Sequence, residues 1–268
     1  MAAARRFRAA GGTHLFLATQ NYGARVPRTL DDYARQFEQT EALGRAVAAE
    51  TGATVYTVLA PYPIDLVHVA PEIGVPAAEA LQRAALELAA RRVRERAAVA
   101  LGEVGRAHFP VPAEVGEAVE RVFAFAAEMA RETDCPLVVH SEDLDAAGYG
   151  RLAALARAHG LDPGKVVKHY ARERVAPEDR DGVAASFLAK RDLVRSVLAD
   201  GALWFLETDF LDDPNRPGAV LDLGTVPRRA AQVAERGAAD ADRLWVPFSE
   251  SIERVYGFRP APPEPGGA

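Results

Sequence analysis

The chain has 268 residues, 49% of them hydrophobic, and a formal net charge of −6 at pH 7. Its length suits one α/β barrel, and no stretch reaches the roughly 20 consecutive apolar residues that a membrane helix needs. The negative charge argues against broad electrostatic capture of nucleic acid, and the single cysteine, Cys135, excludes an internal disulfide and a cysteine-based zinc cluster.

The chain begins with a short basic segment, in which positions 5, 6 and 8 are arginine. A secretion signal would continue with an apolar run of about 7–15 residues and a cleavage site, and neither follows here. We therefore expect a cytoplasmic protein without a membrane partner. The sequence gives no indication of the oligomeric state.

In chain order, a short helix over residues 2–10 precedes seven apolar runs separated by amphipathic segments. The runs predict strands at Thr13–Thr19, Thr54–Ala60, Ala97–Glu103, Pro136–Ser141, Val166–Ala171, Val183–Leu188 and Leu203–Thr208. The clearest helices between them are expected at Leu30–Glu50, Pro76–Arg96, Glu114–Arg131 and Leu144–His159. Most runs are continuously apolar before they end in a polar residue, as strands buried on both faces of a parallel sheet are.

This alternation predicts a TIM-type (β/α) barrel that occupies residues 1–258 as a single domain. The remaining residues, 259–268, are rich in proline and glycine and predict a disordered tail. A closed barrel of this type has eight strands, so one strand is unaccounted for at the front. We therefore expect an open barrel with a gap between the first and the last run.

Four of the last five runs end in, or directly before, a side chain that can bind a metal. These side chains are Glu103, His140, His169 and Asp209. Catalytic residues of such barrels lie at the C-terminal ends of several strands, and two imidazoles with two carboxylates suit zinc or a mixed transition-metal site. The metal would make a nucleophile from water, and Asp209 could accept its proton.

Each of these residues also has a simpler interpretation, because a histidine at a strand end is often only a satisfied polar group. Four ligand-type residues at successive strand ends favour the metal site. The loop after the last strand contains Arg216, and Arg228 lies beyond it. Either guanidinium could bind an anionic group of a substrate, although the loop could equally be a solvated turn.

The ordered motifs Gly-Glu-Val-Gly (102–105), Pro-Leu-Val-Val-His-Ser-Glu (136–142), Val-Val-Lys-His-Tyr (166–170) and Glu-Thr-Asp (207–209) resemble the TatD-related metal-dependent hydrolases of the amidohydrolase superfamily. The stretch 212–220 and Thr-Val-Pro-Arg-Arg (225–229) resemble the archaeal-type branch. The resemblance implies a divalent-metal hydrolase. The family's site holds two metals or one; the resemblance makes Glu103 the shared carboxylate ligand, His140 and His169 ligands of the second metal, and Asp209 the last ligand and the proton acceptor. It implies no catalytic role for Glu207.

The sequence departs from that family at two places. The His-x-His pair of the family's first strand is absent, and Tyr62-Pro63 replaces the usual His-Pro. His14 falls in the segment that matches the family's second strand, so we expect a structural role for it. An in-frame segment upstream of Met1 would explain the missing strand and motif.

The resemblance implies hydrolysis of an ester bond, with a phosphoester as one candidate, on a small-molecule or nucleotide-like substrate. Nucleic acid is a weaker candidate because of the net charge. Zinc is the first choice for the metal, with magnesium and manganese as alternatives. Two other functions stay open: hydrolysis of a C–N bond, and a barrel that has lost catalysis and serves as a binding or scaffold protein.

Overall fold

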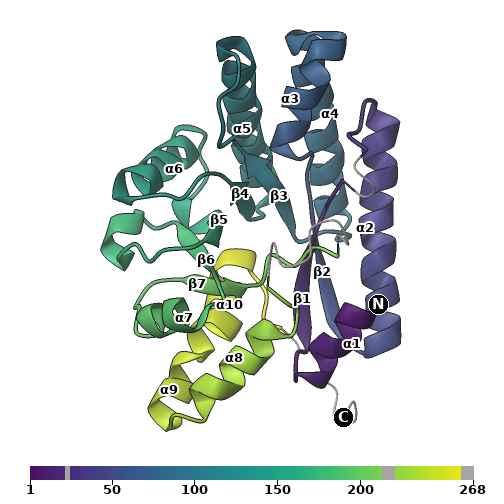
Figure 1. Ribbon diagram of the computed structural model, residues 1–268. Coiled ribbons are helices and arrows are strands. Elements are labelled where there is room, and N and C mark those ends of the chain that lie inside the picture. The colour runs from purple at the N-terminus through teal and green to yellow at the C-terminus, as the bar shows by residue number, and fades with distance from the viewer. Residues whose placement is uncertain (22–24, 213–220, 261–268) are drawn as a thin grey trace.

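The computed structural model describes residues 1–21, 25–212 and 221–260. Its strands are β1 (His14–Ala18), β2 (Thr54–Leu59), β3 (Ala100–Gly105), β4 (Leu137–His140), β5 (Val166–Ala171), β6 (Ala184–Leu188) and β7 (Trp204–Glu207). They form one parallel sheet in chain order, from β1 to β7 (Figure 1). The predicted α/β barrel with an opening is confirmed, because within the described residues β1 and β7 are edge strands that do not pair with each other.

Most helices connect successive strands, whereas one precedes the first strand and three follow the last. They are α1 (Ala2–Ala9), α2 (Leu30–Thr51), α3 (Pro63–Ile73), α4 (Val75–Arg94), α5 (Ala113–Thr133), α6 (Ala146–Ala158), α7 (Arg191–Val197), α8 (Thr225–Ala234), α9 (Ala238–Arg243) and α10 (Ser251–Tyr256). Short turns of other helix types are η2 (Pro163–Lys165), η3 (Pro177–Arg180) and η4 (Val246–Glu250). No helix of the described residues is long and apolar enough to cross a membrane.

Local chemistry explains where the long helices begin and end. Thr29 caps α2: its side chain accepts a hydrogen bond from the amide of Asp32, and the Asp32 carboxylate accepts one from the amide of Thr29. The hydrogen bond from the Thr29 hydroxyl, with further bonds at the cap, lowers the pKa of Asp32 to about 2. Gly52 ends the helix in the left-handed conformation (φ 67°) that glycine adopts without strain.

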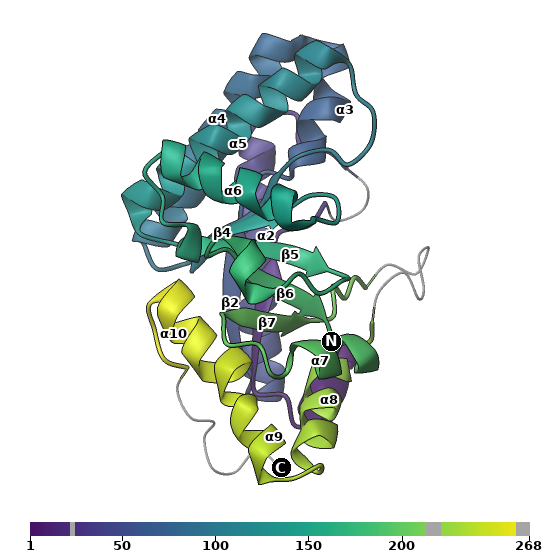
Figure 2. The ribbon, with the colours of Figure 1, turned by 90° about the vertical axis from the view of Figure 1, so that its left-hand side faces the viewer.

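The apolar residues form two layers on the two faces of the curved sheet. The larger cluster lies between the sheet and the outer helices and includes Phe37, Leu86, Leu101, Phe123 and Trp204. A smaller one lies inside the curve, where Val167, Ala184 and Phe205 of three strands contact Ile252 and Val255 of α10. Figure 2 shows α10 on the side where the strands begin. The inner face is therefore closed at the strand starts, and the strand ends are left for polar side chains.

Two elements differ from the sequence-based expectation in ways that affect the strand-end face. The third strand begins at Ala100 rather than Ala97, so Glu103 lies within β3 and not at its end. Helix α3 was not predicted from the sequence, and it contains prolines at 63 and 71. Pro63 occupies the first turn of the helix, where its missing N–H costs no hydrogen bond.

Candidate metal centre

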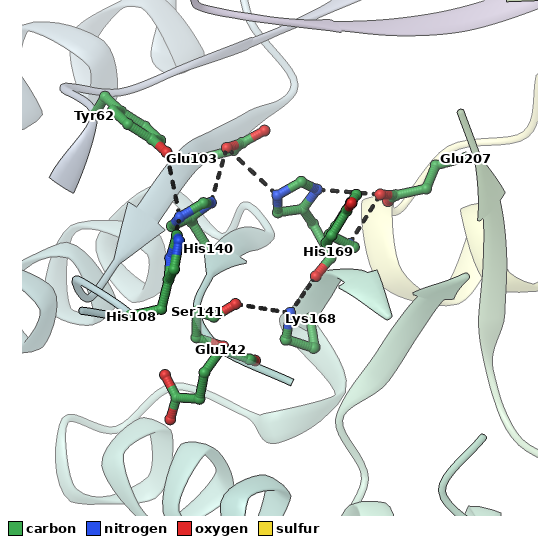
Figure 3. Close-up of polar contacts among 10 residues, drawn as sticks. Tyr62, Glu103, His108, His140, Ser141, Glu142, Lys168, His169 and Glu207 are labelled. Atoms are coloured by element: carbon green, nitrogen blue, oxygen red, sulfur yellow. Dashed lines mark hydrogen bonds and ion pairs between the residues drawn. The ribbon is translucent and has the colours of Figure 1, made fainter. Parts of the chain in front are cut away.

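Three side chains from three neighbouring strands meet at the C-terminal edge of the sheet. Glu103 comes from β3, His140 from the last residue of β4 and His169 from β5 (Figure 3). The Oε2 atom of Glu103 lies 3.6 Å from Nδ1 of His140 and 3.5 Å from Nε2 of His169. One potential ligand atom from each residue lies within 4.8 Å of the others. The three side chains are largely buried, so their polar atoms need partners.

The geometry of this group fits a divalent cation. Nδ1 of His140 is buried and has no hydrogen-bond partner among the described residues, although it faces Glu103. Ligand atoms bound tetrahedrally at about 2.0–2.1 Å are separated by about 3.4 Å, which is close to the two distances to Glu103 Oε2. A carboxylate with two imidazoles is a donor set that suits zinc, and it leaves a coordination position for water.

Each histidine uses its second ring nitrogen for a contact on its outer side. Nδ1 of His169 lies 3.2 Å from Oε1 of Glu207, which also accepts a hydrogen bond of 2.8 Å from the amide of Tyr170. Nε2 of His140 lies 3.2 Å from the Tyr62 hydroxyl and 3.1 Å from Nδ1 of His108. Such outer contacts fix the ring orientation of metal-binding histidines.

The charges of the centre are strongly coupled. Burial alone would lower the pKa of His169, but the carboxylates of Glu103 and Glu207 outweigh it and raise the pKa to about 9. Burial alone would raise the pKa of Glu103, but the charge of His169, followed by the imidazole of His140, lowers it. Without a cation, His169 is therefore a proton-bearing group beside an ionised carboxylate. A bound cation would take the place of that proton.

This coupling predicts a pH dependence for the metal-free protein. The pKa of His169 is about 9 in the folded chain and about 6.5 when unfolded, so protonation stabilises the fold. That stabilisation is complete below pH about 6.5 and is lost as the pH rises through about 9. Urea unfolding of the chelator-treated protein should show a falling free energy of unfolding across this window. In His169→Asn the decline should disappear; an equal decline there would assign it to another group.

Close backbone contact holds β3 and β4 in position for the centre. Gly105, with φ of 134°, lies so near the carbonyl of His140 that a Cβ atom would sit 2.0 Å from that oxygen. The register between the two strands shifts between Leu101 and Val104, just where Glu103 lies. Lys168 is almost fully buried, and its ammonium donates to the carbonyls of Ser141 and His169. It thus ties together the backbone at both histidines.

The other residues singled out in the sequence lie outside the three-residue group. Asp209 follows β7 with φ of 48° and is not part of that group, but its charge contributes to the raised pKa of His169. Arg228 lies on α8 and forms an ion pair of 2.8 Å with Asp222. Arg216 lies outside the described residues. His14 is the first residue of β1, so it lies at the end of the sheet where the strands begin, away from the three-residue group, and its ring stacks on Tyr56.

The residues that contact the two histidines from outside were not assigned a role from the sequence. Glu207 belongs to a recognised motif, and its place at the end of β7 was a usable signal. Tyr62 was noted only as a replacement for histidine. His108 lies in a loop after β3 without a motif around it, so nothing in the sequence places it beside His140.

Comparisons with known proteins identify the family and the fold of the chain. A family model described as TatD related DNase matches residues 1–257. An uncharacterised protein of Methanocaldococcus jannaschii is 34% identical over 158 residues, which are 59% of this chain and 56% of that protein. The matched part therefore spans little more than half the length of that relative.

Solved structures show a similar fold at low identity. A TatD homologue of Escherichia coli is 19% identical, with a TM-score of 0.61 over 96% of this chain and 91% of its own. A phosphotriesterase homology protein of Escherichia coli, solved with phosphate in its active site, is 16% identical, with a TM-score of 0.56 over 91% of this chain and 97% of its own. At this identity the two structures support the fold alone.

Proposed function

Because the chain belongs to the family of TatD-related DNases, we propose that it is a metal-dependent hydrolase whose cation is held by Glu103, His140 and His169. The observation that carries the proposal is the convergence of these three buried groups, with Nδ1 of His140 facing Glu103 and otherwise unpaired among the described residues. A divalent cation bound there supplies Lewis acidity, which polarises an ester and lowers the pKa of a water. Zinc fits the donor set best, with magnesium or manganese as alternatives.

The protein's own groups have distinct parts in this reaction. Glu103 supplies the negative charge that draws a cation between the two imidazoles. The Glu207 carboxylate contacts Nδ1 of His169, and this contact leaves Nε2 of the same ring directed at Glu103. We assign Asp209 as the group whose carboxylate oxygen accepts the proton of the attacking water, because it follows β7 at this edge and acts on His169 electrostatically.

A cluster of basic side chains favours a phosphoester over an uncharged amide as the substrate. Burial, followed by repulsion from Arg191, Arg195 and Arg228, lowers the pKa of Arg229. Arg191 and Arg229 form no ion pair with a described residue. Arg229 donates to the carbonyl of Ala189, whose amide donates to the carbonyl of Glu207. The cluster therefore adjoins the strand ends near the centre, where it would attract an anionic substrate.

A substrate panel tests the proposed reaction. Protein freed of metal by a chelator is assayed with and without added Zn²⁺ or Mn²⁺ on bis(4-nitrophenyl) phosphate, 4-nitrophenyl acetate and a 4-nitroanilide. Turnover of the phosphodiester only after reloading supports the proposal. Turnover of the anilide alone would favour C–N hydrolysis. Failure on all three substrates, with metal bound, would favour a binding protein.

The basic cluster gives a separate prediction. In Arg191→Glu and Arg195→Glu we expect the KM for the anionic phosphodiester to rise by about 3–10-fold and the kcat to stay unchanged, because long-range attraction is lost. The effect should shrink as salt rises. Arg254→Glu, on α10 at the far end of the strands, is the matched control. An equal change in KM for uncharged 4-nitrophenyl acetate would rule out an electrostatic origin.

A further inference from the structure

The two histidines of the centre differ in what holds them from outside. His169 is held by a carboxylate, whereas His140 faces two groups that carry no negative charge, the hydroxyl of Tyr62 and the ring nitrogen of His108. Both aromatic rings contact His140, with centroids 5.1 Å away in each case (Figure 3). His140 lies between the rings of Tyr62 and His108, and His108 is exposed.

The position of one proton decides whether His140 can bind a cation. Binding through Nδ1 requires that this atom carry no hydrogen, so a neutral ring must carry its hydrogen on Nε2. That N–H then needs an acceptor, and Nδ1 of His108 at 3.1 Å and the Tyr62 oxygen at 3.2 Å can each provide one. In the opposite form, Nδ1–H faces Glu103 at 3.6 Å, and the Tyr62 hydroxyl donates to Nε2.

The two acceptors are held with different rigidity. Tyr62 precedes the first turn of α3, and its carbonyl accepts a hydrogen bond of 3.0 Å from the side chain of Gln82 on α4. His108 lies in the exposed segment between β3 and α5, next to Phe109. A hydroxyl can donate as well as accept, so Tyr62 accommodates both forms of His140. His108, when neutral with its hydrogen on Nε2, selects the binding form.

We propose that His108 and Tyr62 are positioning residues that hold His140 with its hydrogen on Nε2 and so set the affinity of the centre for its cation, with His108 selecting the binding form. The inference rests on the proposed function, because it concerns the same centre. Loss of an outer partner of a metal-binding histidine lowers metal affinity by about 10–100-fold in general. We expect a loss in this range when both acceptors are removed.

The test compares variants that remove or keep the acceptor. Zn²⁺ affinity is measured by competition with a chromophoric chelator for the full chain, His108→Leu, His108→Asn, Tyr62→Phe and the Tyr62→Phe/His108→Leu double variant. Long-range ¹H–¹⁵N spectra of the metal-free proteins report which ring nitrogen of His140 carries hydrogen. Phe109→Leu changes the ring beside His108 but keeps both acceptors, and it serves as the control.

We expect His108→Leu to bind Zn²⁺ about tenfold more weakly and to shift the His140 hydrogen toward Nδ1. In His108→Asn the amide oxygen can replace Nδ1 as acceptor, so affinity and spectrum should return toward those of the unaltered chain. Two outcomes would overturn the inference and leave the proposed function standing. One is equal Zn²⁺ affinity in the unaltered chain and the double variant, and the other is failure of His108→Asn to restore the affinity that His108→Leu loses. Absence of Zn²⁺ binding to the unaltered chain would instead overturn the proposed function.

Discussion

Glu103→Gln is expected to retain less than a tenth of the zinc that the unaltered chain binds and to lose about 10³-fold or more in hydrolytic rate. Glu103 is the only carboxylate in the three-residue group, and its Oε2 atom lies within 3.6 Å of both imidazoles. An amide keeps the volume of the side chain but removes the charge that attracts a cation. Zinc per chain, measured by mass spectrometry after dialysis, and kcat/KM on the phosphodiester check both effects.

Glu142→Gln provides the matched control for this prediction. Glu142 lies two residues beyond His140 and forms an ion pair of 3.8 Å with Arg106, but it is not part of the three-residue group. It should keep zinc and activity. Because removal of one member of a buried ion pair can cost about 3–5 kcal/mol, unfolding of both variants is measured to show that they fold. Normal zinc content in folded Glu103→Gln would show that the cation binds elsewhere.

Gly105→Ala is expected to cost about 4 kcal/mol or more of folding free energy, or to prevent folding. The new methyl carbon would sit 2.0 Å from the His140 carbonyl, so β3 and β4 must separate, and the φ of 134° is unfavourable for alanine. Gly201→Ala is the control, because nothing lies within 4 Å of its Cβ position. Urea unfolding gives the comparison. Equal free energies of unfolding in the two variants would contradict this account of how β3 and β4 are held.

The strand pattern was predictable because each strand is a short apolar run that ends at a polar residue. The runs at 166–171 and 203–208 correspond to β5 and β7 within one residue at each end. The start of β3 was placed three residues early, since Ala97 and Ala98 are apolar like a strand but belong to the turn after α4. Apolar content alone does not separate a strand from the turn before it.

The three ligand-type residues of the site could be predicted from the sequence, but the side chains that contact them from outside could not. Glu103, His140 and His169 stand at or near the ends of successive parallel strands, and such ends share one edge of the sheet. The contacts of His140 with Tyr62 and His108 depend on two connecting segments, and no periodic pattern fixes the path of such a segment. Glu207 was recognised as part of a motif, but only the fold shows that its carboxylate faces His169.

The metal centre is tested most directly by anomalous diffraction from a crystal of the protein soaked in Zn²⁺, recorded on both sides of the zinc absorption edge. We predict one anomalous peak about 2.0–2.2 Å from Glu103 Oε2, His140 Nδ1 and His169 Nε2. A peak bound through His140 Nε2 and His108, or the absence of any peak at this edge of the sheet in a soaked crystal that diffracts well, would contradict the central claim that these three side chains form the metal centre.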